Sequence, residues 1–252
     1  MKENNIVIND LLGYEGLKIC QRPDMFNFSL DSTILAYYVR INKTTKKIID
    51  LGCGNGYIPI FLTMRTNAHI DGVDIQKEAC DLANKSIEIN KLEDQITIYN
   101  EDLKTIHQTL GVATYDVVTS NPPYFIYKES SLINDSIYKV IARHEIKVTL
   151  DEVIHAAKIL LKDGGIFAMV HRAERLLDIL DSLRKNGFEA KRLLFIYPKT
   201  NSTEALGIFI ESIKSNKKGG LKILPPIYVY DNDNNYTKDI LKIFNYNKEE
   251  QC

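Results

Sequence analysis

Long apolar runs are missing from this sequence. No stretch reaches the length of a membrane-spanning helix, and the first ten residues, MKENNIVIND, contain no apolar core of the length found in secretory signals. Internal repeats and low-complexity tracts are also absent. These absences argue against a helical membrane protein and a repeat array, and we expect a cytoplasmic protein with no membrane partner. With 252 residues, 44% of them hydrophobic, the chain suits one α/β domain with a modest appendage.

Cysteine is scarce and scattered. The four cysteines form no CxxC pair and have no histidine at metal-ligand spacing; they are Cys20, Cys53, Cys80 and Cys252. A structural zinc site needs such clustered ligands. We therefore expect reduced thiols and no bound metal.

An excess of charge of one sign is lacking as well. The net charge is −1, which argues against a uniformly basic nucleic-acid binder. The distribution is uneven, because residues 184–222 have nine basic and three acidic side chains. Runs of charge are commonly solvated faces. Beside a nucleobase site, however, this segment would become a candidate track for phosphates.

From residue 46 onward the sequence alternates short strand-like runs with amphipathic stretches. The alternation predicts strands at 46–51, 69–75, 96–100, 115–120 and 164–171, and helices at 77–90, 150–162 and 173–187. Two further strand-like runs, at 190–198 and 204–212, predict an antiparallel hairpin at one edge. Together they indicate a Rossmann-like α/β fold, in which a mostly parallel seven-stranded sheet has helices on both faces.

The two ends of the chain lie outside this alternation. Residues 1–45 form a predicted leader, with a hairpin-like stretch at 11–20 and a helix at 29–41 that Ser29 or Asp31 would cap. We expect the leader to pack on the cofactor site of a domain that spans 46–252. Residues 221–252 are its C-terminal extension, with a Pro-Pro break, a tyrosine-rich run and a short helix.

A glycine-rich turn, DLGCGNG, directly follows the first of these strands. It supplies Asp50, Gly52, Cys53, Gly54 and Gly56 as candidate cofactor-binding residues. Glycines let the backbone approach a ligand closely. The dinucleotide fingerprint requires a further glycine at position 57, which is tyrosine here. Because Asp50 suits a cation better than a phosphate, the turn fits S-adenosylmethionine, which has sulfonium and ammonium groups.

Carboxylates follow the next two strands. Asp74, with Ile75 beside it, ends the second strand, where a doubly wound sheet meets a ribose. Asp102, with Leu103 beside it, follows the third strand, where an adenine amino group needs an acceptor. Each acid alone could be a helix cap or a loop residue, but their succession favours a cofactor site. The arrangement resembles the Class I S-adenosylmethionine-dependent methyltransferases over residues 46–213.

The fourth strand ends in the motif Asn121-Pro122-Pro123-Tyr124. At this position the motif resembles that of methyltransferases that act on planar amino nitrogens. The exocyclic nitrogen of a base is a weak nucleophile, because its lone pair is delocalised into the ring. The Asn121 side-chain oxygen and the Pro122 carbonyl can accept its two N–H groups, with two fixed proline φ angles directing the carbonyl. Tyr124 offers a face on which a base can stack. A simple strand-ending turn is the structural alternative.

The motif indicates the reaction class better than the substrate. Enzymes with it methylate adenine in DNA, adenine or guanine in RNA, or a glutamine amide in protein. Adenine DNA methyltransferases usually have a long recognition region, and the glutamine enzymes have a longer helical N-terminal domain. Here only some 45 residues precede the first strand and the insertion at 125–149 is about 25 residues long, so we expect neither class.

Several segments resemble the bacterial tRNA (adenine-37-N6)-methyltransferases that act on valine tRNA. They are DLLGY at 10–14, QRPDMFNFSLDSTILAYYV at 21–39, ARHE at 142–145, YPK at 197–199 and PPIYVY at 225–230. The resemblance implies a cytoplasmic enzyme that uses S-adenosylmethionine. It places Phe28 and Ser29 at the cofactor, together with the residues above and Asn121, and makes residues 121–124 the base site.

We expect tRNA as the partner of a monomeric protein. The candidate substrate-binding residues are Phe125, Arg143, His144, Lys191, Arg192 and Lys199. Arg143 could instead pair with Glu145. Two rival functions stay open: an rRNA guanine-N2 methyltransferase, and an RNA-binding protein that keeps the cofactor fold without turnover.

Overall fold

The structure is a computed structural model that describes residues 6–13, 15–25, 30–122, 124, 148–215 and 218–246. Its elements follow the chain as β1 (Val7–Asp10), β2 (Lys18–Gln21), α1 (Leu30–Tyr38), β3 (Lys47–Leu51), α2 (Tyr57–Thr63), β4 (His69–Val73), α3 (Lys77–Asn90), β5 (Ile96–Tyr99), α4 (His107–Leu110), β6 (Tyr115–Ser120), α6 (Leu150–Leu160), β7 (Leu161–Arg172), a 3-10 turn (Ala173–Arg175), α7 (Leu176–Lys185), β8 (Phe188–Lys199), β9 (Gly207–Lys214), β10 (Lys222–Ile223), β11 (Ile227–Tyr230) and α8 (Lys238–Phe244).

One large sheet organises the chain. Its strand order is β10-β8-β9-β7-β6-β3-β4-β5, and β11 also pairs with β8. Strands β3 to β7 pair in parallel, whereas β9 is antiparallel to both β7 and β8. The expected α/β class with seven main strands is confirmed. Two short strands of the C-terminal extension, β10 and β11, continue the sheet beyond the β8–β9 hairpin in parallel with β8.

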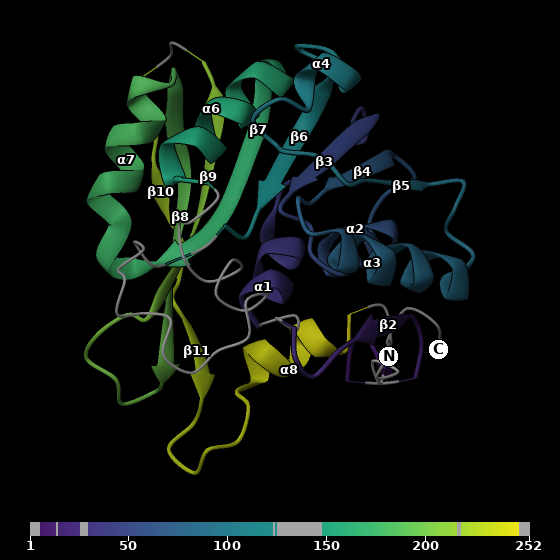
Figure 1. Ribbon diagram of the computed structural model, residues 1–252. Helices are drawn as coiled ribbons and strands as arrows, with labels where there is room; N and C mark the ends of the chain where they lie inside the picture. Colours follow the sequence, from purple (N-terminus) through teal and green to yellow (C-terminus); the bar gives the residue numbers. More distant parts are fainter. Residues whose placement is uncertain are drawn as a thin grey trace.

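Helices cover both faces of this sheet (Figure 1). Side chains of alternate residues in the central strands enter two separate cores: Ile48 and Val117 face α1, α2 and α8, while Ile49 and Val118 face α6 and α7. Strands that are buried on both faces need apolar side chains at nearly every position. This burial on both faces explains the short apolar runs in the central strands.

Helix α2 is an element that the sequence pattern did not indicate. Its residues YIPIFLT are all buried except Thr63, so the segment has no polar face to give a helical period. Pro59 lies in the first turn, where its missing N–H is tolerated. The turn before it needs glycine, because Gly56 has a φ of 83° and precedes the helix.

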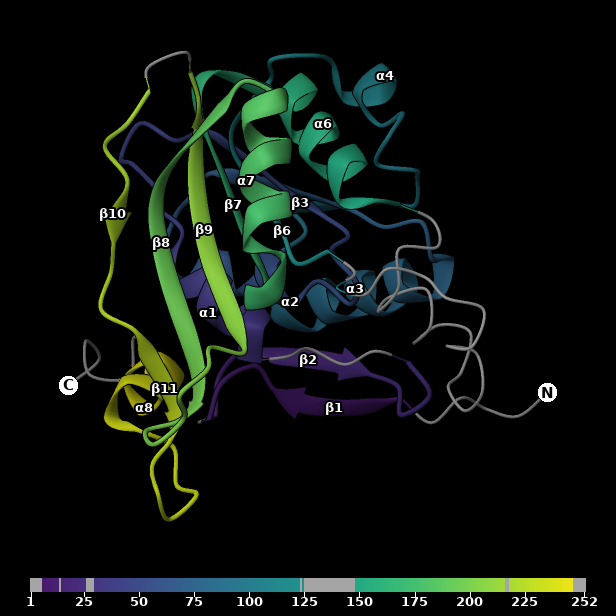
Figure 2. The same cartoon turned by 90° about the vertical axis from the view of Figure 1, so that its left-hand side faces the viewer.

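The β1–β2 hairpin forms a second, two-stranded sheet (Figure 2). The hairpin differs from the predicted stretch at 11–20, because its first strand lies before that stretch and its second strand ends one residue after it. The backbone of Lys18 exchanges two hydrogen bonds with the Asn90 side chain, at 2.8 and 2.7 Å, which holds β2 against α3. The hairpin also reaches the glycine turn, since Asn55 Nδ2 donates to the Cys20 carbonyl at 3.1 Å.

Candidate functional site

The glycine turn and the Asn121 motif leave the sheet side by side. Strands β3 and β6 are neighbours, and Leu51 pairs with Ser120, so residues 52 and 121 both follow the last paired position. Helix α2 then packs in the core on one face of the sheet, and α6 in the core on the other. Such a switch point leaves a crevice at the carboxyl ends of parallel strands, where α/β proteins bind ligands.

The glycine turn is held in shape by the neighbouring strand. The N–H groups of Gly52 and Cys53 both donate to the Val73 carbonyl, at 2.9 and 3.0 Å. A Cβ added at Gly52 or Gly54 would meet no atom within 4 Å. The turn is therefore fixed on its sheet side and open on the other, as a backbone cradle for a ligand requires.

Asp50 lies beneath this turn with one unused oxygen. Its side chain is 1% exposed, and Oδ1 accepts a hydrogen bond from the Thr119 hydroxyl at 2.7 Å. Oδ2 is buried without a partner among the described residues. Burial, and to a smaller extent the charge of Asp74, raises the pKa of Asp50 to about 8. A cationic ligand nearby would favour the ionised carboxylate, so this residue fits the sulfonium and ammonium groups of the expected cofactor.

Asp74 shapes the turn from the end of β4. Its Oδ2 accepts from the Gly54 N–H and its Oδ1 from the Gln76 N–H, both at 2.9 Å. Burial raises its pKa, and these backbone N–H groups counter the rise. Each carboxylate oxygen has a second lone pair. Contact with a ribose stays a prediction, and Ile75 beside it is 44% exposed at the open side.

Asp102 has a local role in this structure. Its Oδ1 accepts from the Lys104 N–H at 2.9 Å, and its Oδ2 lies 3.5 Å from the Lys104 ammonium. These contacts are those of a turn-capping acid. Leu103 packs partly buried against the core beneath α6. Recognition of an adenine by Asp102 and Leu103 therefore also stays a prediction.

Asn121 and Tyr124 are held together by helix α1. The Asn121 amide nitrogen donates to the Ser32 hydroxyl at 2.8 Å, and the Tyr124 hydroxyl donates to Asp31 at 3.0 Å. The same hydroxyl also hydrogen-bonds to Asn121 Oδ1. Pro122 is buried, and Pro123 and Phe125 lie outside the described residues. The oxygen that we expect to accept a base N–H is thus held by Tyr124.

Four residues around this motif were not singled out from the sequence as site residues. Asp31 was considered only as a helix cap, and Ser32, His171 and Arg172 were not considered. The His171 ring meets Tyr124 edge-on at 5.4 Å between centroids. Burial, with Arg175 nearby, lowers the pKa of His171 to about 4, so the imidazole is neutral at pH 7. His171 and Arg172 end β7, next to β6, and their polar character after an apolar strand was the usable signal.

Asp31 is the buried acid of this cluster. Burial raises its pKa, and the Tyr124 hydroxyl and the nearby charge of Arg172 counter the rise. The Nε of Arg172 is buried without a partner among the described residues. The site therefore has polar groups from α1, β6 and β7 that converge around one aromatic ring.

The predicted substrate-binding residues do not form one cluster. Arg143 and His144 fall outside the described residues, as do the predicted cofactor residues Phe28 and Ser29. Lys191 and Lys199 lie eight residues apart on β8, a distance of about 25 Å along a strand. Arg192 donates to the Tyr38 carbonyl at 2.9 Å and pairs with Glu211 at 3.1 Å.

Neither a membrane span nor a metal cluster occurs in the described part of the chain. No helix there is long and apolar enough to cross a bilayer. In the same residues, no group of three or more His, Cys, Asp or Glu side chains could hold a metal ion.

Curated relatives share the sequence over much of its length. A tRNA1(Val) (adenine(37)-N6)-methyltransferase of Parabacteroides distasonis is 29% identical over 153 residues, which is 61% of this chain and 63% of the relative. The protein of the same name from Dyadobacter fermentans is 24% identical over 204 residues, 81% of this chain and 82% of the relative. The chain thus spans somewhat under two thirds of the first relative and about four fifths of the second.

Solved structures share the fold. The crystal structure of a predicted O-methyltransferase from Agrobacterium tumefaciens superposes with a TM-score of 0.67 at 18% identity, covering 85% of this chain and 95% of that chain. P. horikoshii TYW2 in complex with MeSAdo superposes with a TM-score of 0.59 at 14% identity, covering 84% and 73%. The family model of the methyltransferase small domain matches residues 16–186, which include both the glycine turn and the Asn121 motif. The chain therefore belongs to the methyltransferase small domain family.

Proposed function

We propose that this protein transfers a methyl group from S-adenosylmethionine to N6 of an adenine in tRNA, at position 37 beside the anticodon of valine tRNA. The observation that carries the proposal is the adjacency of the open glycine turn and Asn121 across β3 and β6. A methyl donor and an amino acceptor must meet in such a crevice. The curated relatives, named for this activity, support the choice of adenine in tRNA.

The cofactor would be held by the residues at three successive strand ends. Asp50 and the turn at 52–56 fit its charged end, Asp74 its ribose, and Asp102 its adenine. When bound, it supplies an activated methyl group on a sulfonium. The unused Asp50 oxygen and the open side of Gly52 and Gly54 are the features that fit this group.

The acceptor side depends on this chain's own groups. Asn121 Oδ1 and the Pro122 carbonyl accept the two amino N–H groups of the adenine, which turns the nitrogen lone pair toward the methyl group. Tyr124 stacks on the base. Catalysis is then mainly positioning, with nitrogen and methyl in line about 3–3.5 Å apart. Proton loss can follow transfer, so no strong base is required.

Substrate binding must also rearrange Tyr124. Its hydroxyl bonds the same Asn121 oxygen that the base would use. A flipped adenine that stacks on the ring and donates to Asn121 replaces this contact, and the Tyr124 hydroxyl keeps Asp31 as an alternative acceptor. The contact thus keeps Asn121 satisfied when no base is present.

We also propose that residues 1–45 act as a leader on the cofactor site of a domain spanning 46–252. The hydrogen bond from Asn55 in the glycine turn to Cys20 in β2, and the bond from Asn121 to Ser32 in α1, support this division. A monomer in the cytoplasm is the simplest setting for such an enzyme.

The test is a methyl-transfer assay with labelled S-adenosylmethionine, followed by nucleoside analysis. Total tRNA, rRNA fragments, duplex DNA and a glutamine-bearing peptide are offered in parallel. We expect N6-methyladenosine from tRNA alone, lost in Asn121→Ala and retained in Asn84→Ala, a change at an exposed position of α3. N2-methylguanosine in rRNA would show the first rival function. Cofactor binding without any product would show the second.

A further inference from the structure

Two adjoining hollows lie beside the C-terminal end of helix α1. The first, of about 410 Å³, is lined by Arg40, Lys191, Arg192, Ile213, Gly220 and Lys222. The second, of about 450 Å³, shares Arg40 and Arg192 and adds Arg65, Tyr37, Tyr38 and Tyr246 among its lining residues. We call the two together the cationic hollow. Its residues come from segments far apart in the sequence, so folding gathers these charges.

Positive charge exceeds negative charge among the contacts of the hollow. Glu211 is fully buried and accepts from Arg40 Nε at 2.5 Å and Arg192 Nη1 at 3.1 Å. It also accepts from the Arg40 backbone N–H at 2.9 Å. One carboxylate thus serves two guanidinium groups.

Two lysines and a second acid also lie at or near the hollow. The Lys191 ammonium donates to the Gly219 carbonyl at 2.5 Å, and the Gly219 N–H donates to Glu189 at 2.9 Å. Lys222 is exposed on β10. Both ammonium groups line the hollow, so their charges add to it.

Glu211 also fixes where the two arginines lie. Because it is buried in β9, it holds Arg40 and Arg192 from below without offering its own charge at the surface. Arg192 is fixed further by the Tyr38 carbonyl at 2.9 Å and by the Phe209 ring, 5.7 Å from its guanidinium carbon. Guanidinium groups fixed in this way lose little side-chain entropy when they bind an anion.

We propose that the cationic hollow binds the phosphate backbone of the RNA substrate; this rests on the proposed function. Helix α1 links the hollow to the acceptor site, because Ser32 at one end bonds Asn121 and Arg40 follows the other end. Eight residues of helix span about 12 Å. RNA whose target base lies at Asn121 would therefore have neighbouring phosphates within reach of the hollow.

The spread of the charges favours RNA over a small anion. The cations come from the end of α1, the segment after α2, β8 and β10, and they surround two hollows rather than one. A single phosphate would occupy only one of these. Tyrosine hydroxyls at the rim can donate to further phosphate or sugar oxygens, as in many nucleic-acid complexes. The assignment also gives a role to part of the basic segment at 184–222.

The test compares Lys191→Ala/Lys222→Ala with wild type in tRNA binding across a salt series. Both lysines can be removed without touching the Arg40–Glu211–Arg192 contacts. If each contacts a phosphate, the slope of log affinity against log salt falls by about 1.4–1.8. We expect roughly tenfold weaker binding at low salt. Lys46→Ala/Lys47→Ala, an exposed pair at the start of the interior strand β3, removes the same charge and should change neither quantity.

Control measurements separate this inference from the proposed function. Unfolding curves and the dissociation constant for S-adenosylmethionine should be unchanged in both double variants. Charge reversal, Lys191→Glu/Lys222→Glu, should weaken binding further. An unchanged salt slope in Lys191→Ala/Lys222→Ala, with wild type forming N6-methyladenosine in tRNA, would overturn the hollow and leave the function. A reduced slope without any methylated tRNA in wild type would keep the hollow and overturn the function.

Discussion

The hydroxyl and the ring of Tyr124 make separate contacts in the proposed base site. Its hydroxyl bonds both Asp31 and Asn121, and its ring lies edge-on against a buried neutral histidine. The hydroxyl and the ring therefore have different duties. The hydroxyl satisfies Asn121 before the base arrives, and the ring supplies the stacking surface afterwards.

This division predicts different effects for two substitutions at Tyr124. Tyr124→Phe keeps the ring and frees Asn121 Oδ1, so we expect kcat within about threefold of wild type and a KM for tRNA that is equal or lower. Tyr124→Ala removes stacking worth about 1–3 kcal/mol per base, which corresponds to a KM roughly 5- to 150-fold higher. Steady-state methyl transfer with varied tRNA measures both. Equal impairment of the two variants would show that the hydroxyl itself is needed.

The raised pKa of Asp50 predicts that the affinity for the cofactor depends on pH. Its pKa of about 8 leaves the carboxyl mostly protonated at pH 7, whereas a cationic ligand favours the ionised form. The affinity for S-adenosylmethionine should rise from pH 6 to about pH 8, by up to about tenfold per pH unit, and then level off. Calorimetric titration measures this profile. Asp50→Asn should flatten it, while Asp94→Asn, at an exposed position, should not.

The same carboxyl makes an opposite contribution to stability. Its pKa in the folded chain is raised above its ordinary value of 3.8, so the folded state binds the proton more tightly than the unfolded state. The stabilisation is complete below about pH 4 and is lost as pH rises through about 8. Without cofactor, wild type should therefore lose more stability between pH 6 and 8.5 than Asp50→Asn. Equal losses would show that Asp50 ionises normally.

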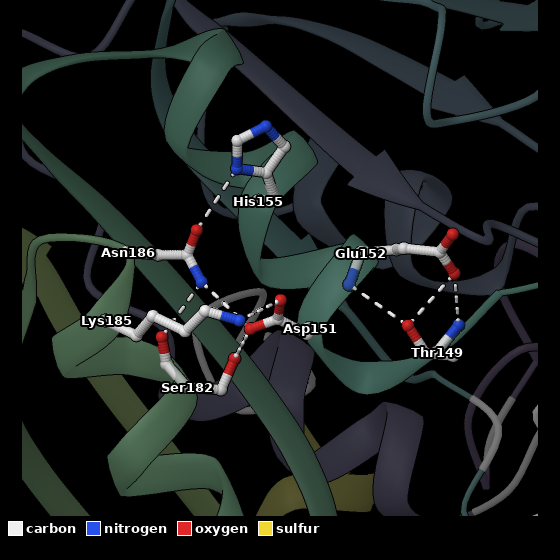
Figure 3. Close-up of polar contacts among 7 residues, drawn as sticks. All are labelled: Thr149, Asp151, Glu152, His155, Ser182, Lys185 and Asn186. Atoms are coloured by element: carbon white, nitrogen blue, oxygen red, sulfur yellow. Dashed lines mark hydrogen bonds and ion pairs between the residues drawn. The ribbon is translucent and has the colours of Figure 1, made fainter.

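At the scale of elements, side-chain contacts anchor the start of helix α6 (Figure 3). Thr149 caps the helix: its hydroxyl accepts from the Glu152 N–H at 3.3 Å, and Glu152 accepts from the Thr149 N–H at 2.8 Å. Asp151 in the first turn accepts from Ser182 at 2.6 Å and pairs with Lys185 at 2.9 Å. The start of α6 is thus joined to the end of α7.

Loss of the cap should therefore destabilise the fold. Thr149→Ala removes both the hydroxyl acceptor and one half of the capping box, so we expect a loss of about 1 kcal/mol in the free energy of unfolding. Urea denaturation measures it. Thr203→Ala, at an exposed loop position, should stay within about 0.5 kcal/mol. Equal effects at the two positions would mean that the cap contributes nothing.

Elements whose signal is local were predictable from the sequence, and those defined by distant contacts were not. The strand before the glycine turn and helix α3 follow from short-range periodicity, and α3 has the predicted bounds, Lys77–Asn90. Helix α2 was missed because burial on all sides removes the polar face. The contact between Ser32 and Asn121 was also missed, because the two residues are 89 positions apart and neither segment has a local pattern that indicates the other.

For the whole molecule, the C-terminal extension is part of the main core. Ile227, Val229, Ile240 and Ile243 are buried in the cluster beneath α1 and α2, and β11 extends the sheet beside β8. The tyrosines of the extension stack in pairs, with Tyr228 on Tyr197 at 5.2 Å and Tyr236 on Tyr230 at 5.0 Å. Packing therefore accounts for these aromatic side chains.

Helix α8 offers a matched pair of substitutions that tests this role. Ile240 is fully buried, while Leu241 is 45% exposed on the same helix. Ile240→Ala should lower the free energy of unfolding by about 2–5 kcal/mol, because it leaves a cavity in the core. Leu241→Ala should cost much less, since a largely exposed side chain loses few contacts. Urea denaturation compares them directly. Similar small losses at both positions would mean that the extension is only loosely attached. A large loss at Ile240 alone would show that helix α8 is part of the cooperatively folded core, and Tyr246, which lines the cationic hollow, follows this helix.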